Sequence, residues 1–130
     1  MNEPSEPIRD ADSMFERNMT GLLGRAFSQP LKLLGQSDAS LSSYAVFWSV
    51  ADNEGTTQVE VARRTGLSAK TVSRVISLLG ETKQGRGWIR QEFDPADRRI
   101  RRLSLSRKGK NVHRKMLEDI SDFAVEAANN

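Results

Sequence analysis

Residues 57–79 read TQVEVARRTGLSAKTVSRVISLL and organise the interpretation of the whole chain. The first part predicts a short helix that begins after Thr57. Glu60 stands three residues later, so each of the two side chains can bond to a free amide of the other residue. The helix should end before Gly66, since glycine readily takes the left-handed conformation just past a helix.

A second helix is predicted to follow at once, over residues 69–81. Ser68 is a suitable cap, and only Leu67 separates it from the glycine that ends the first helix. Two helices so close in sequence must turn sharply against each other. Residues 57–81 therefore predict a helix-turn-helix.

The second helix has two faces when its residues are placed about 100° apart. Its apolar side chains cluster on one side and should face the core: Val72, Val75, Ile76 and Leu79. The other side carries short or basic side chains and no carboxylate: Lys70, Ser73, Arg74 and Ser77, with Thr71 on the flank and Ser68 at the cap. These residue types suit a reader of the DNA major groove, where they bond to base edges and phosphates. The alternative is an ordinary solvated face of a surface helix.

Two β-prone runs, residues 88–93 and 100–105, enclose the polar, turn-rich loop 94–99. Together they predict a two-stranded wing over residues 88–105. A hairpin beside a recognition helix can reach the neighbouring minor groove, whose narrow form attracts arginine.

The register of this wing is left open by the sequence. If Phe93 pairs with Ile100, Glu92 lies opposite Arg101 and makes a favourable cross-strand charge pair. A slip of one residue would exchange the two faces, and the mixed alternation does not decide between the registers.

Helices are also predicted on both sides of this region. The first should start between Asp10 and Ser13 and kink or end at Pro30. Ser42 is expected to cap the next helix and Ser106 the last one. The predicted fold class is α+β, mainly α: a winged helix-turn-helix with a two-stranded wing and flanking N- and C-terminal helices.

The two terminal helices, residues 10–34 and 107–127, are candidates for dimerisation. The last one carries an apolar stripe at helical spacing: Val112, Met116, Leu117, Ile120, Phe123, Ala124 and Ala127. The first helix of the same monomer could cover this stripe. A two-fold homodimer could cover it as well and would present two recognition helices together.

Four sequence pieces in a fixed order resemble the MarR-type winged-helix transcriptional regulators, over residues 41–109. They are LSSY at 41–44, the helix-turn-helix just quoted, DPADRR at 94–99 and LSLSRKG at 103–109. The resemblance implies a sequence-specific regulator of transcription, a repressor, that binds double-stranded DNA. Helix 69–81 would read the major groove, and the wing loop would read the minor groove.

The resemblance also suggests roles for single residues. Arg98 is favoured over Arg99 as the minor-groove probe. Asp94, Asp97 and Arg99 would be partly structural and would hold the hairpin closed. Clefts beside the helix that LSSY opens would bind a small aromatic effector in such regulators. The side chains that could line this effector pocket, or could simply be core, are Tyr44, Phe47 and Trp48.

The sequence departs from that family pattern in two places. The segment 80–86 is several residues longer than the usual step into the wing, and its composition predicts a mobile basic loop. This loop could add phosphate contacts through Lys83 and Arg86, or it could simply be a tolerated insertion, which is slightly favoured. The sequence also has one long helix after the wing, where such regulators have a further helix that helps form the dimer.

Composition limits the class of protein. The 130 residues, 37% hydrophobic, suffice for one small core, so residues 10–130 are predicted to form a single domain after a flexible segment 1–9. No run is long and apolar enough for a membrane span, and the N-terminus lacks a basic apolar signal, so a cytoplasmic protein is expected. The absence of cysteine excludes disulfides and thiolate metal sites.

Charge is distributed unevenly along the chain. Residues 63–115 hold sixteen Lys and Arg against four Asp and Glu, a net charge of +12, whereas the whole chain carries only +3. The basic excess coincides with the recognition helix and the wing, as expected of a surface that binds a polyanion. The basic segment lacks an exposed apolar stripe, so nucleic acid is a better partner than a membrane surface.

An enzyme is not expected, because no catalytic, metal-binding or cofactor-binding set of residues is evident. The single histidine, His113, stands among basic residues, and a surface position is predicted for it. The glycines at 85 and 87 follow no strand and so form a turn, not a phosphate loop.

A second hypothesis keeps the fold but changes the role. A winged helix can serve as a protein-interaction module, for example an accessory factor in replication or plasmid maintenance that binds DNA weakly or through a partner. The long segment 80–86 favours this reading, and the basic excess disfavours it.

Overall fold

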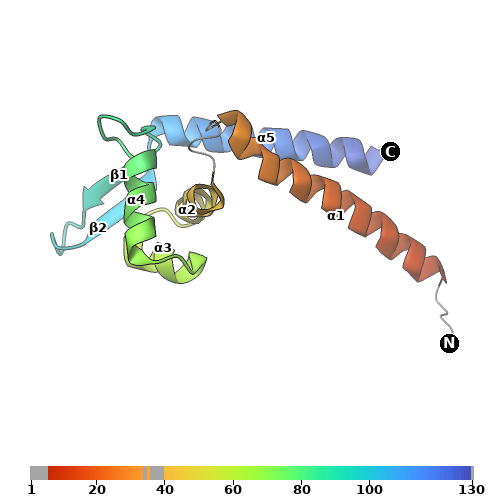
Figure 1. The fold of residues 1–130 in the computed structure, drawn as a ribbon, viewed down its shortest axis with the longest axis horizontal. Coiled ribbons are helices and arrows are strands. Elements are labelled where there is room, and N and C mark those ends of the chain that lie inside the picture. Colours follow the sequence, from red (N-terminus) through yellow and green to blue (C-terminus); the bar gives the residue numbers. More distant parts are fainter. Residues whose placement is uncertain (1–5, 34, 36–39, 130) are drawn as a thin grey trace. The chain divides into compact units, whose positions relative to one another are not determined.

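The computed structural model describes residues 6–33, 35 and 40–129, with side chains for residues 16–33, 35 and 40–126. The elements of this part of the chain are α1 (Glu6–Leu33), α2 (Leu41–Asp52), α3 (Gln58–Thr65), α4 (Ala69–Leu79), β1 (Ile89–Phe93), β2 (Arg101–Leu105) and α5 (Arg107–Asn129) (Figure 1). The predicted fold class, mainly helical with a two-stranded antiparallel wing, is confirmed. The chain divides into two compact units, Met1–Gln29 with Met116–Asn130, and Pro30–Lys115.

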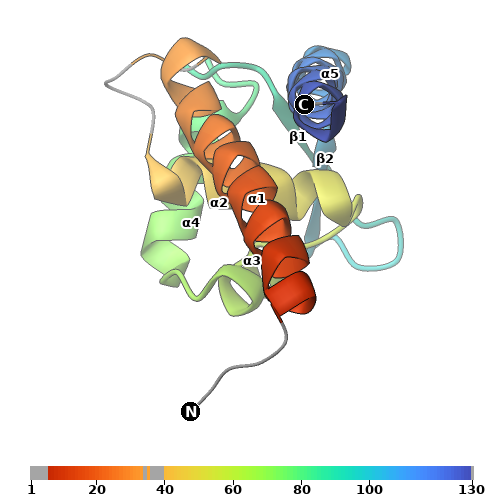
Figure 2. The same cartoon turned by 90° about the vertical axis from the view of Figure 1, so that its right-hand side faces the viewer.

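The helix-turn-helix lies in the second unit, where α2, α3 and α4 pack against one another (Figure 2). The apolar face predicted for α4 is fully buried: Val72, Val75, Ile76 and Leu79 are at most 1% exposed. Phe47 of α2 and Val61 of α3 are equally buried. The amphipathic pattern of α4 therefore determines which of its faces remains outside.

The helix boundaries in this region follow local chemistry. Thr57 and Glu60 form the expected capping box, and Gly66 takes the left-handed conformation at φ 77°. The Ser68 hydroxyl accepts the amide of Thr71 and starts α4. These three predictions are confirmed.

The predicted cap of α2 is wrong by two residues. Ser40, not Ser42, precedes the helix, and its Oγ accepts the amide of Ser43 at 3.0 Å. Both serines are chemically suitable caps. Starting the helix at Leu41 adds half a turn.

The wing strands are paired one residue away from the register considered above. Phe93 lies opposite Arg101 and Glu92 opposite Arg102, so a pairing of Phe93 with Ile100 is wrong. On the other side of β2, Leu103 exchanges two backbone hydrogen bonds with the turn before α3, through Gly55 N and Thr56 O. Burial of Leu103 and Leu105 against the helices fixes the face that β2 turns inward.

Residues 80–86 form a hydrogen-bonded turn and not the mobile loop that was expected. Arg86 N donates to Leu78 O, Gly87 N to Gly80 O and Trp88 N to Leu79 O. The turn thus satisfies carbonyls at the end of α4 that would otherwise lack partners. Its extra residues serve as a helix cap.

The start of α5 packs closely against the start of the wing. Ser106 caps the helix as predicted, because its Oγ accepts the amide of Gly109 at 3.0 Å. A Cβ on Gly109 would collide with the backbone carbonyl of Trp88, so only glycine fits there. The surface position predicted for His113 is wrong: its ring is half-buried, with its centroid 5.2 Å from that of Trp48.

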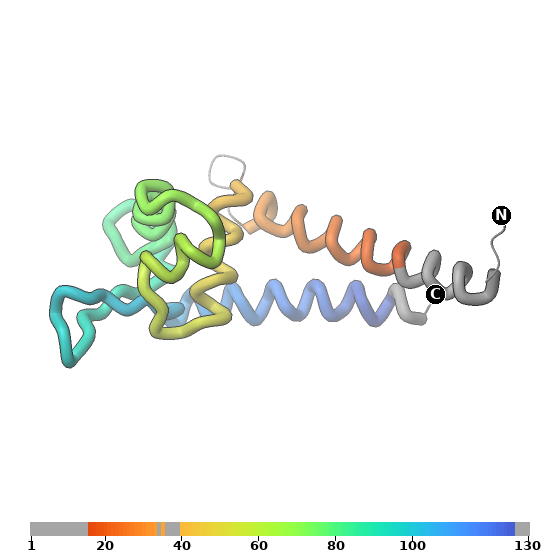
Figure 3. The backbone as a smooth tube through the Cα atoms, turned by 90° about the horizontal axis from the view of Figure 1, so that it is seen from below, coloured from red at the N-terminus to blue at the C-terminus, as the bar shows by residue number. Residues whose placement is uncertain are grey.

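The first unit contains the greater part of α1 and the end of α5, which run antiparallel beside each other (Figure 3). Gln29 Nε2 donates to Met116 O at 3.1 Å, and the Arg25 guanidinium lies over the ring of Phe123. Several apolar side chains of these segments remain exposed: Met19, Leu23, Phe27, Leu117 and Val125.

The boundaries of α1 differ from the prediction. The helix begins at Glu6 instead of between Asp10 and Ser13, so residues 6–9 are helical. Pro7 is compatible with this start, because proline is tolerated in the first turn. Pro30 does not end the helix, which continues to Leu33.

Candidate nucleic-acid interface

The exposed face of α4 carries the residues proposed to read DNA. Every member of this set is exposed except Thr71, which is half-buried on the flank as expected: Ser68, Lys70, Thr71, Ser73, Arg74 and Ser77. Within the described part of the chain, neither Lys70 nor Arg74 has a hydrogen-bonding or ion-pairing partner. Both charges are therefore available to an external anion. Ser68 is already engaged as the helix cap.

A polar network fixes α3 beneath this face. Arg64 donates through Nε to Ser49 Oγ at 3.0 Å and through Nη2 to Thr56 Oγ1 at 2.7 Å. Thr56 Oγ1 in turn donates to Glu60 Oε1, which also accepts the amide of Thr57. These bonds tie α3 to α2 and to the turn that precedes α3. The sequence analysis assigned no role to Arg64.

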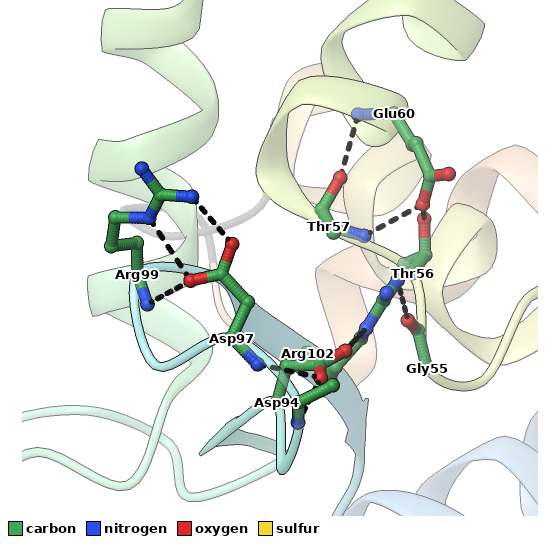
Figure 4. A network of polar contacts seen from close by, with 9 residues as sticks. Gly55, Thr56, Thr57, Glu60, Asp94, Asp97, Arg99 and Arg102 are labelled. Atoms are coloured by element: carbon green, nitrogen blue, oxygen red, sulfur yellow. Dashed lines mark hydrogen bonds and ion pairs between the residues drawn. The ribbon is translucent and has the colours of Figure 1, made fainter.

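The wing loop is closed by Asp94, as the family resemblance implied (Figure 4). Its Oδ1 accepts the amides of Ala96 at 2.7 Å and Asp97 at 3.2 Å, and its Oδ2 accepts Arg102 Nε at 2.9 Å. One carboxylate thus holds both the loop and the adjoining strand.

Asp97 holds a different arginine. It accepts two hydrogen bonds from the Arg99 guanidinium, at 3.0 and 2.9 Å, and one from the Arg99 amide. The pair is solvent-exposed, with 89% of the Arg99 side chain accessible. Arg99 therefore enters any DNA contact with its charge already partly neutralised.

Arg102 connects the wing to the helical part of the unit. Besides its bond to Asp94, its Nη1 donates to the carbonyl of Gly55, 3.2 Å away in the turn before α3. Sequence reasoning missed this residue. The only available signal was its place on β2, since a link to Gly55 depends on tertiary structure.

Arg98 and Arg101 have no carboxylate partner in the described residues, unlike Arg90, which lies within 4.0 Å of Glu81 and Glu92. The Arg98 guanidinium lies 5.6 Å from the centre of the Phe93 ring, and that of Arg101 lies 5.2 Å from it. Both distances fall within the range of a cation–π interaction. Phe93 is 53% exposed, so it is not part of the core.

The carboxylates of this region are stabilised in their charged form. Hydrogen bonds from the Ala96 amide and from Arg102 lower the pKa of Asp94. The guanidinium and the amide of Arg99 lower the pKa of Asp97, and the same ion pair raises the pKa of Arg99. The network is consequently fully formed at neutral pH.

An open pocket of about 490 Å³ lies between the start of α3 and the end of the wing loop. It is lined by Thr57, Gln58, Val59, Arg99, Ile100 and Arg101. Among the wing arginines, Arg101 thus both borders this surface hollow and lies over the exposed ring of Phe93.

The three effector-pocket candidates lie together on α2. Tyr44 and Phe47 are buried and Trp48 is half-buried, with edge-to-face ring pairs between Tyr44 and Trp48 and between Phe47 and Trp48. Burial raises the pKa of the Tyr44 hydroxyl. His113 completes this aromatic cluster from α5. A role in binding an effector stays a prediction.

A family model described as "MarR family" matches residues 37–100, which include α2, the helix-turn-helix and the wing loop. The chain carries a winged-helix domain of the MarR family. The match covers the elements that position the exposed face of α4, together with the wing loop, and it supports a DNA-binding transcriptional regulator.

Solved structures with the same fold include members of this class. The transcriptional regulator Tm0710 from Thermotoga maritima is 22% identical, with a TM-score of 0.68 over 88% of this chain and 78% of that one. Reduced AbfR bound to DNA is 22% identical, with a TM-score of 0.58 over 91% and 79%. PcaV from Streptomyces coelicolor in complex with its natural ligand is 27% identical, with a TM-score of 0.57 over 86% and 77%. A comparison with curated proteins found no match.

Two further findings concern the residues that the structure describes. Among them, no group of three or more His, Cys, Asp or Glu side chains is arranged to hold a metal ion. None of the helices described is long and apolar enough to cross a membrane.

Proposed function

We propose that this protein is a sequence-specific regulator, a repressor, that binds double-stranded DNA as a homodimer. The α4 face would enter the major groove, where Lys70, Thr71, Ser73, Arg74 and Ser77 contact bases and phosphates. The wing loop would reach the minor groove through Arg98 and Arg99. The observation that carries the proposal is that Lys70 and Arg74 are exposed and have no bonding partner among the described residues, on a helix whose other face is completely buried.

This observation supports DNA reading for an electrostatic reason. In the wing, Arg99 and Arg102 are each bound to a carboxylate, so their charges already serve the fold. Lys70 and Arg74 have no such partner among the described residues. Beside small hydroxyl side chains, they can contact phosphates and base edges without clash. The buried face of α4 prevents the helix from rotating these groups away.

A dimer is supported by the apolar side chains left exposed on the terminal helices. Met19, Leu23 and Phe27 lie at four-residue spacings along α1 and are 37 to 57% exposed. A second copy could cover them and would set two recognition helices about one DNA turn, or 10 base pairs, apart.

An effector pocket at Tyr44, Phe47 and Trp48 is part of the proposal. PcaV, which shares the fold, has been solved with its natural ligand. Trp48 is the least buried of these three residues, so a small aromatic molecule that binds there would quench its fluorescence.

The function can be tested by selecting bound duplexes from a random DNA pool at about 150 mM salt, where non-specific phosphate attraction is weakened. Enrichment of an inverted repeat with half-sites about 10 base pairs apart is the expected result. Recovery of unenriched DNA, or of none, would overturn the proposal and favour a protein-interaction module.

A further inference from the structure

Besides Arg90 on β1, which lies near Glu81 and Glu92, the wing contains four arginines that are held in two different ways. Arg99 and Arg102 are bound to carboxylates, whereas Arg98 and Arg101 lie over the ring of Phe93. Both kinds of partner hold the arginine side chain in place, but they differ in their effect on its charge. A carboxylate neutralises the guanidinium, while an aromatic ring leaves its charge and its N–H donors available.

The place of Phe93 on β1 explains why its ring lies outside the core and beside the two arginines. Ile89, Gln91 and Phe93 share one face of β1, and only Ile89 is buried, so this face runs beyond the core before it reaches Phe93. Arg101 lies directly opposite Phe93 in the strand register, and Arg98 reaches the ring from the loop between the strands. A phenylalanine that is 53% exposed contributes little to the core, but it can hold the two cations beside it.

We propose that Phe93 is a positioning residue that presents Arg98 and Arg101 to DNA, and that Arg101 is a further DNA-contacting residue. This inference rests on the proposed function. Ordering long side chains before binding reduces the entropy lost on binding, and a ring partner does so without an ion pair that DNA would have to displace. Arg98 and Arg101 thus keep their full charge for DNA, whereas the charge of Arg99 is partly neutralised by Asp97 before any contact is made.

The decisive variants change only the ring. In Phe93→Leu the apolar side chain remains but the π face is lost, and affinity for the selected duplex should fall roughly three- to tenfold. In Phe93→Trp the π face is retained, and affinity should equal or exceed that of the wild type. Gln91→Ala, on the same face of the same strand, is the matched control and should leave affinity unchanged.

A double-mutant cycle separates positioning from a general loss of wing structure. In an Arg98→Ala, Arg101→Ala background, Phe93→Leu should have no further effect on affinity, because the ring has no cation left to position. The double arginine variant alone should bind more weakly than Phe93→Leu, since it removes the contacts themselves. A further loss in that background would overturn the inference.

The geometry can also be observed without DNA. The Nε–Hε signals of Arg98 and Arg101 in NMR spectra of the full chain should show ring-current shifts that disappear in Phe93→Leu and persist in Phe93→Trp. Normal wild-type binding together with unchanged affinity of Phe93→Leu would overturn this inference and leave the proposed function intact. Equal losses in the Leu and Trp variants would also overturn it. Failure of the wild type to bind any duplex would overturn both proposals.

Discussion

The exposed face of α4 and the wing loop both carry arginine, but different forces hold them in place. The α4 face is positioned from below by four buried apolar side chains, and its cations make no bonds to the described part of the protein. The wing has little core of its own and is shaped by carboxylates that bind arginine side chains and backbone amides. A DNA-reading surface can thus be made rigid by burial in one element and by polar bonds in the next.

The comparison predicts that packing variants damage the helix face most. Ile76→Ala removes a side chain that is 1% exposed and should cost about 2–5 kcal/mol of unfolding free energy, through lost burial and a cavity. Chemical denaturation followed by circular dichroism measures this loss. Ser73→Ala, on the exposed face of the same helix, should change stability by less than about 0.5 kcal/mol. Similar effects for both variants would show that α4 is not anchored by this face.

Arg74→Ala should affect binding instead of folding. The side chain has no partner in the described residues, so the free energy of unfolding should hardly change. Specific binding should weaken by roughly 1–3 kcal/mol, with relaxed preference at one base pair. Titration of the selected duplex and of single-base variants checks this. Lys83→Ala, in the turn after α4, should weaken binding to all sequences alike. Equal losses of affinity for specific and random DNA in Arg74→Ala would show that Arg74 contacts only phosphates and reads no base.

Breaking the ion pair between Arg102 and Asp94 should have a smaller and more local effect than the two preceding variants. Arg102→Gln removes the ion pair with Asp94 and should lower the free energy of unfolding only slightly, because solvent screens a surface ion pair. Hydrogen exchange should accelerate in residues 94–100 while the amides of α4 remain protected. Asp97→Asn is the matched control, because it weakens an exposed pair that does not reach the helices. Loss of protection in α4 would contradict the separation of the two regions.

Lowering the pH should have the smallest of these effects and should change the wing loop before the core of α4. The pKa values of Asp94, Asp97 and Glu60 are lowered in the folded protein, chiefly by hydrogen bonds to backbone amides and to arginine. Their stabilising contribution is therefore complete above the unfolded-state pKa, near 4, and is lost as pH falls through the lower folded-state values. NMR spectra collected between pH 6 and about 2.5 should show changes in the wing loop before changes in the core of α4. Simultaneous changes would contradict this order.

The same contrast explains what could be predicted from the sequence. The caps at Thr57 and Ser68, the glycine at 66 and the buried side of α4 depend on residues close in sequence, and the structure confirms them. The register of the wing, the bond from Arg102 to Gly55 and the stacking on Phe93 depend on residues brought together by the fold. His113 was misplaced for this reason, because its basic neighbours in sequence are not its neighbours in space.

Segment 80–86 shows how composition can mislead. Its glycines and polar residues are typical of a mobile loop, but in the structure their backbone groups satisfy the end of α4. A Cβ on Gly85 would collide with the carbonyl of Gly80, so this glycine permits close approach of the backbone and not mobility. The extra length therefore belongs to the scaffold of the recognition helix.

The most direct test of the account is the ratio of affinities for the selected duplex and for a scrambled duplex, measured for the wild-type protein at about 150 mM salt. An exposed helix face that reads bases, supported by a wing that reads groove shape, predicts a ratio of roughly 10³ or more. A ratio near one, even with tight binding, would show that the basic surface only neutralises phosphates, and would contradict sequence reading by α4.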